Sequence, residues 1–151
     1  MQLTHNLLVL VGVLAFSAGA AGQPGGAVPV QKHWKGFQNA YTDKPQNLVI
    51  KTADQWKTVW TKTHAFMTPA PPMPPVDFDK QMVLAVFMGQ KPSGGHAIEI
   101  TKVVPAGQGL TVHVKETKPG PGDITTAVIT SPYYFAVVPK VAGDVKFVTD
   151  K

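Results

Sequence analysis

The sequence contains no cysteine and no arginine. Without cysteine there can be no disulfide, no thiol catalysis and no thiolate metal site, so packing alone must stabilise the fold. Without arginine the chain lacks the planar fork that usually recognises phosphates and nucleic acids, and its lysines are scattered along the chain. We therefore expect no nucleic-acid partner. The formal net charge of +5 favours an acidic partner through long-range attraction.

Long apolar runs are also missing, with one exception at the N-terminus. Leu7–Phe16 is uninterrupted and apolar, but shorter than the roughly 20 residues that span a bilayer as a helix. The small residues Ser17–Gly22 follow it, as before a signal-peptidase site. The pattern predicts a signal peptide over residues 1–21, a mature chain that starts at Ala21 or Gly22, and a secreted or periplasmic protein. An apolar N-terminal strand is the alternative.

The rest of the chain has the length of one domain. We expect a flexible Pro/Gly leader over residues 22–31, followed by a single domain over residues 32–151. A chain of this size buries about two-thirds of its unfolded surface. No later segment approaches transmembrane length, so we expect no integral membrane segment after signal cleavage.

One helix is predicted over Thr52–Thr63. Thr52 lies three residues before Gln55, which is the spacing of a capping box. Trp56, Val59 and Trp60 fall at i, i+3 and i+4 and form one apolar face. We interpret the two tryptophans as anchors of the helix on a sheet, with a ligand platform as the alternative.

Most of the remaining chain has β patterns. Met82–Met88 is apolar throughout, which is typical of a central strand buried on both faces. Leu110–Lys118 alternates apolar and polar residues, which indicates one buried face. The fold class is therefore mainly β (α+β): an antiparallel β-sandwich or curled barrel with one packed helix. The proline-rich segment Thr68–Val76 is expected to cross rigidly from the helix to the sheet. Further strands are predicted at 35–41, 47–50, 97–104, 126–130, 133–138 and 145–148.

Residues for catalysis or metal binding are sparse. No histidine pair has HxH or HxxxH spacing, although His96 and His113 could meet if their strands are neighbours. Ser93 and Ser131 are the only serines after the predicted signal, and neither lies in a nucleophile elbow. We therefore expect that the protein is not an enzyme and that it binds neither a metal nor a cofactor.

Three loops contain residues that a tight turn alone does not require. Each combines proline with glycine or tyrosine, which favours a rigid rim suited to binding a protein or peptide. Of the adjacent Tyr133 and Tyr134, alternation predicts that one is buried and one exposed, and we expect Tyr133 on the rim. Plain tight turns are the alternative. The predicted partner-binding residues are Lys91, Pro92, Ser93, Gly94, Gly95, His96, Pro119, Gly120, Pro121, Gly122, Pro132 and Tyr133.

An ordered series of motifs from about Val49 onward resembles the PrcB C-terminal domain family, named for an accessory subunit of a bacterial surface protease complex. The series comprises Trp56 with Trp60, Pro74–Phe78, Met82–Gly89, Lys91–His96 with Ile98–Ile100, Lys118–Gly122 and Ser131–Tyr133. The resemblance implies a non-catalytic module that assembles or stabilises a secreted or periplasmic protease.

A weaker likeness gives an alternative. Pro92–Gly95 and Pro132–Tyr133 are similar in order to the binding loops of chagasin-type inhibitors of cysteine proteases. That hypothesis requires the three loops to lie at one end of the fold. A periplasmic metal-binding protein or enzyme is a more distant alternative.

Overall fold

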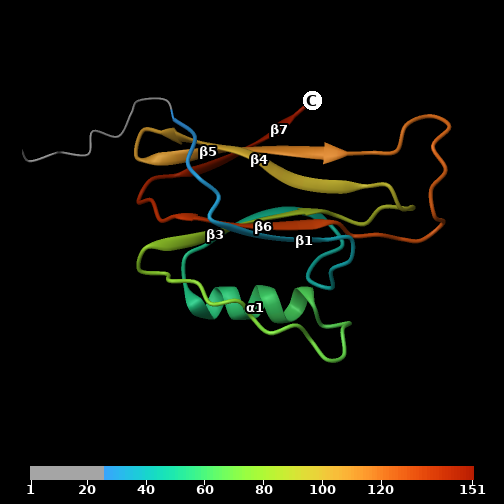
Figure 1. The fold of residues 1–151 in the computed structure, drawn as a ribbon, viewed down its shortest axis with the longest axis horizontal. Coiled ribbons are helices and arrows are strands. Elements are labelled where there is room, and N and C mark those ends of the chain that lie inside the picture. Colours follow the sequence, from blue (N-terminus) through green and yellow to red (C-terminus); the bar gives the residue numbers. More distant parts are fainter. Residues whose placement is uncertain (1–25) are drawn as a thin grey trace, which may run out of the picture.

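A computed structural model describes residues 26–151, so the predicted signal peptide and its cleavage site lie outside the described residues. Figure 1 shows three layers: a small sheet, a larger sheet and a helix on the outer face of the larger sheet. Neither sheet closes into a barrel, and the predicted β-sandwich with one helix is confirmed. The elements are β1 (Lys32–Gly36), β2 (Pro45–Ile50), α1 (Ala53–Thr63), β3 (Gln81–Met88), β4 (Ala97–Ala106), β5 (Gly109–Thr117), β6 (Tyr133–Pro139) and β7 (Val145–Asp150).

The larger sheet has the order β1-β6-β3-β2, and all its strand pairs are antiparallel. Its two central strands, β3 and β6, are buried on both faces. Alternate residues of each strand enter two separate cores, one between the sheets and one beneath the helix. The prediction of a doubly buried central strand at Met82–Met88 is confirmed.

The smaller sheet has the order β4-β5-β7 and contains the one departure from antiparallel pairing among the described strands. β4 and β5 form an antiparallel hairpin, but β5 and β7 run parallel. The antiparallel pairing predicted for the sandwich therefore holds for every pair of the described strands except this one. The chain leaves β6 in the larger sheet and crosses to the smaller one before β7 begins, so no hairpin turn fixes the direction of β7 against β5.

Helix α1 forms as its sequence predicts. The side-chain oxygen of Thr52 accepts from the Gln55 amide at 3.3 Å, and Thr52 has extended backbone angles. The Gln55 side chain accepts from the amide of Lys51 at 3.2 Å rather than from that of Thr52, so the reciprocal half of the box is displaced by one residue. Trp56 and Trp60 are buried against the sheet, which confirms their role as anchors.

The proline-rich segment accepts a hydrogen bond from each of the two helix tryptophans. The indole nitrogen of Trp56 donates to the Pro74 carbonyl at 3.1 Å, and that of Trp60 donates to the Pro71 carbonyl at 3.0 Å. The crossover from helix to sheet predicted at Thr68–Val76 is confirmed. Buried indoles need such acceptors, and the prolines supply carbonyls from an extended backbone without helical or sheet partners.

Two predicted strands are misplaced. The first strand is β1 at Lys32–Gly36 rather than 35–41, because the Asn39 side chain accepts from the amides of Tyr41 and Thr42 and turns the chain there. Residues 126–130 form no strand beyond one bridge between Thr130 and Lys91. The segment bonds to the loop between β3 and β4 instead, and it cannot add to β6, whose two sides are occupied by β1 and β3.

Candidate functional site

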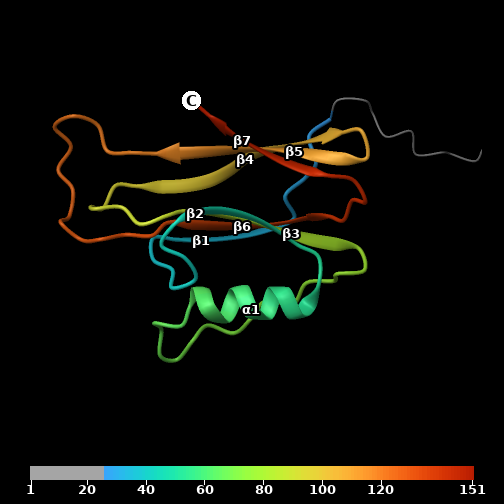
Figure 2. The ribbon, with the colours of Figure 1, turned by 180° about the vertical axis from the view of Figure 1, so that it is seen from behind.

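The three predicted loops, residues 91–96, 118–123 and 131–133, lie at one end of the sandwich. Together with residues 37–39 and 124–130 they form a surface that we call the loop end: residues 37–39, 91–96 and 118–133. Residues 91–96 connect β3 to β4, and residues 118–132 connect β5 to β6. Figures 1 and 2 show the second connection as a long excursion that passes from the smaller sheet to the larger one. The spatial condition for the inhibitor hypothesis is therefore met.

The connection between β5 and β6 is fixed to the loop between β3 and β4. Lys91 and Thr130 exchange backbone hydrogen bonds of 2.8 and 2.9 Å, and the Gly94 amide donates to the Thr126 carbonyl at 3.0 Å. The Thr130 hydroxyl also donates to the Ser93 carbonyl at 2.9 Å. The loop between β3 and β4 and the connection between β5 and β6 therefore form one connected surface.

The glycines of the first loop serve this internal packing. A Cβ on Gly94 would lie 2.4 Å from the Thr126 hydroxyl oxygen. Gly95 has a positive φ of 79°, and a Cβ there would meet the ring of Pro119 at 3.0 Å. The close approach that these glycines permit is made by the protein's own chain, so it is not evidence for the approach of a partner.

The second loop closes on itself at the outer tip. The Gly120 amide donates to the Asp123 carboxylate at 2.6 Å, and the Asp123 amide returns to the Gly120 carbonyl at 3.2 Å. Pro121 and Gly122 lie exposed between them. This turn is preorganised, so a partner that contacts it would order little additional backbone.

Tyr133 does not lie on an exposed rim. Only 7% of its surface is exposed, and its ring packs in the core beneath α1. Burial raises the pKa of its phenol. Tyr134 is buried equally, on the opposite face of β6, because this central strand is covered by α1 on one side and by the smaller sheet on the other. The two rings alternate as predicted, but the prediction that one of them is exposed is wrong.

His96 is half-buried and belongs to its own turn, since its Nδ1 lies 3.1 Å from the Ser93 carbonyl oxygen. His113 does not approach it. Ala97 pairs with Thr117 at one end of the hairpin, whereas His113 pairs with Lys102 further along. His113 instead bonds the Asp150 carboxylate at 2.9 Å.

The structure adds four exposed apolar side chains that sequence reasoning missed: Phe37, Ile124, Val128 and Ile129. All lie at the loop end, where the Gln38 side chain donates to the Ile129 carbonyl at 2.7 Å and the Ser131 amide donates to the Phe37 carbonyl at 2.8 Å. Phe37, Val128 and Ile129 lie in segments for which the sequence predicted strands, whereas Ile124 lies in no predicted strand or loop. The feature of the sequence that could have indicated this surface is the length of the connection between Lys118 and Pro132, because loops this long are commonly functional.

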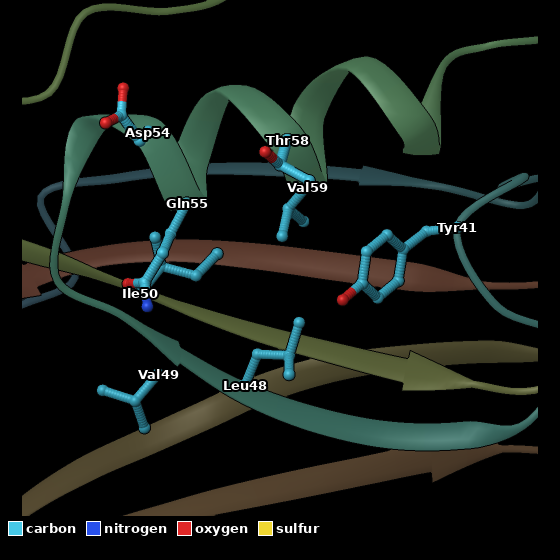
Figure 3. A pocket seen from close by; sticks show the side chains of 8 residues that line it. All are labelled: Tyr41, Leu48, Val49, Ile50, Asp54, Gln55, Thr58 and Val59. Atoms are coloured by element: carbon cyan, nitrogen blue, oxygen red, sulfur yellow. The ribbon is translucent and has the colours of Figure 1, made fainter.

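A second feature is a groove between the edge strand β2 and α1, with a volume of about 360 Å³. Figure 3 shows Leu48 and Ile50 of β2 and Val59 of α1 directed into it. Tyr41 closes one end, and Asp54, Gln55 and Thr58 form the helical rim. Tyr41 also lines a more polar hollow with Gln90 and Ser131, so the groove and this hollow are neighbours.

Within residues 26–151, no three histidine, aspartate or glutamate side chains lie close enough together to hold a metal ion. Among the same residues, no helix has both the length and the apolar character needed to cross a membrane.

The matched family segment contains most of the loop end. Residues 82–139 match the family described as PrcB C-terminal. The resemblance expected from the motifs is thereby confirmed over β3 to β6. The PrcB C-terminal match includes residues 91–96 and 118–133 but not α1 with Trp56 and Trp60, so it is shorter than the motif series suggested. No curated protein and no solved structure matched the chain.

Proposed function

We propose that this chain is an exported, non-catalytic protein-binding module that assembles or stabilises a secreted or periplasmic protease. The PrcB C-terminal match over residues 82–139 carries this proposal, because the family suggests an accessory module of a protease complex. The matched residues include the two connections that form most of the loop end.

The loop end has the physical character of a binding surface. Phe37 is 63% exposed and Ile129 is 57% exposed, and both are held in place by backbone and side-chain hydrogen bonds. Grouped apolar side chains on a rigid support favour binding, because burying them releases water while little chain entropy is lost. The partner-binding role of Lys91–His96 and Pro119–Gly122 remains part of this proposal.

The inhibitor hypothesis is retained as a second candidate because the three loops lie at one end. It is weakened by Tyr133, since the aromatic residue of the third loop faces the core rather than a partner.

Capture from the native host tests the proposal. A tagged full-length chain is expressed there, recovered from the extracellular and periplasmic fractions, and its bound proteins are identified by mass spectrometry. We expect a protease whose activity lasts longer with the chain than without it. A captured protease that loses activity supports the inhibitor instead, and the absence of any protease contradicts both.

A further inference from the structure

The groove between β2 and α1 lies beside a sheet edge whose backbone groups are directed outward. The Met88 amide donates to the Pro132 carbonyl and the Lys140 amide donates to the Lys80 carbonyl, both at 2.9 Å. Even-numbered residues of β3 therefore bond toward β6, and Val83, Ala85 and Phe87 bond toward β2. Their register partners are Ile50, Leu48 and Gln46. The amides and carbonyls of Asn47 and Val49 consequently point to the open edge.

Among the described strands, this edge carries less protection than the other edges. β1 carries Lys32 and Lys35, and β7 carries Lys146 and Asp150. β4 is interrupted by a bulge between Ile100 and Lys102. Charges and bulges of these kinds discourage strand addition. By contrast, β2 has proline only at its first residue, Pro45, and residues 46–50 contain no charged residue and pair in regular register.

We propose that β2 accepts an extended segment of the partner protein as an added strand, with apolar side chains of that segment in the groove against α1. The added backbone would bond Asn47 and Val49, and alternate side chains would reach Leu48, Ile50 and Val59. A strand addition of this kind obtains affinity from the main chain and selectivity from the groove.

Charge defines the flanks of that segment. Lys44 and Lys51 stand immediately before and after β2, and residues 43–63 carry four lysines and two aspartates. A bound segment with an apolar centre and acidic flanks complements this arrangement, and its binding should weaken as salt rises. Tyr41 lines both the groove and the hollow that contains Asn39 and Ser131, so the groove lies beside the loop end. The inference rests on the proposed function only in taking the partner to be a protein.

The probe is the peptide acetyl-Glu-Val-Thr-Val-Thr-Val-Glu-amide, added to the protein and followed by calorimetry and by amide hydrogen exchange in NMR spectra. We expect binding that slows exchange at the amides of Asn47 and Val49. A peptide of the same sequence with alternate backbone nitrogens methylated should not bind, and one with lysine in place of glutamate should bind more weakly. No binding at millimolar peptide, or protection elsewhere only, overturns the inference.

Two variant pairs locate the site. Asn47→Pro removes an outward amide without disturbing the ladder to β3 and should lower affinity about tenfold, whereas Asn47→Thr should not. Thr58→Trp fills the groove and should abolish binding, whereas Thr61→Trp, outside the groove, should not. Equal affinities within each pair overturn the inference.

The two proposals fail separately. If a protease is captured through the loop end but the peptide does not bind at β2, the strand addition is wrong and the proposed function stands. If the peptide binds at β2 but no protease is captured, the proposed function is wrong and the strand addition stands.

Discussion

The phenol oxygen of Tyr133 lies 3.0 Å from Nε2 of His64, and both side chains are buried. Nδ1 of His64 lies 2.9 Å from the Trp60 carbonyl oxygen. A carbonyl can only accept, so in the neutral ring Nδ1 carries the proton and Nε2 accepts from the phenol. This chain of bonds joins the first residue of β6 to the C-terminal end of α1. The tyrosine expected to contact a partner is therefore an internal connection between helix and sheet.

Tyr133→Phe should lower the free energy of unfolding by about 1–3 kcal/mol, because it leaves the buried Nε2 of His64 without a donor. Urea denaturation followed by tryptophan fluorescence measures the change. Tyr41→Phe is the matched control, since Tyr41 is half-buried at the groove, and it should change stability by less than about 0.5 kcal/mol. Equal effects of the two substitutions would show that the bond to His64 contributes nothing.

Stability should also fall at alkaline pH. Burial raises the pKa of Tyr133 and of Tyr134, and the Glu99 carboxylate raises that of Tyr134 further. Unfolded phenols ionise near pH 10, so the unfolded state loses these protons first. The contribution of the two tyrosines to the free energy of unfolding is complete below about pH 10. It is lost as the pH rises from there through their pKa values in the folded protein.

Thermal unfolding from pH 9 to pH 11.5 tests this dependence. Between about pH 10 and 11.5 the wild-type protein should lose stability more steeply than the Tyr133→Phe/Tyr134→Phe double variant. Lysines titrate in the same range in both proteins, so the difference between the two slopes isolates the phenols. Parallel slopes would contradict the prediction.

The close contact between β1 and the Tyr133 ring gives a third prediction. A Cβ on Gly36 would lie 2.6 Å from a ring carbon of Tyr133. Gly36→Ala should therefore destabilise the protein by about 1–3 kcal/mol. At Gly26 a Cβ meets nothing within 4 Å, so Gly26→Ala should change stability by less than about 0.5 kcal/mol. A near-neutral Gly36→Ala in the same denaturation assay would refute the tight packing.

Much of the fold could be predicted because its signals are local. The Thr52 cap, the apolar face of Trp56 and Trp60, and the continuous apolar run of β3 each specify their own element. The direction of β7 could not be predicted, since it depends on which sheet the chain enters after β6. The strand predicted at 126–130 fails because this segment bonds to the loop between β3 and β4, a long-range contact that no local pattern shows.

The binding surfaces were less predictable because exposure depends on the neighbouring layers. Proline and glycine marked the loops correctly, but Tyr133 is buried only because α1 and His64 cover its face of β6. The exposure of Phe37 and Ile129 likewise follows from the strands that these segments fail to form. The groove at β2 combines residues from a strand and a helix, and neither pattern alone shows a cavity.

The export prediction concerns residues outside the described structure. We expect the mature protein from the native host to begin at Ala21 or Gly22, because Leu7–Phe16 and the small residues after it position the cleavage. Intact-mass measurement of protein from the extracellular or periplasmic fraction decides it. A mass that retains Met1 in that fraction would contradict the prediction.

The last prediction tests the loop end directly. Ile129→Asp should lower partner capture about tenfold or more, because it replaces an exposed apolar anchor with a charge that must be desolvated on binding. Stability should change by less than about 0.5 kcal/mol, since the Ile129 side chain is mostly in water. Met73→Asp introduces the same charge at an exposed apolar residue on the proline-rich segment and should leave capture unchanged. If Met73→Asp reduces capture equally, the effect is that of overall charge, and the loop end is not the binding surface.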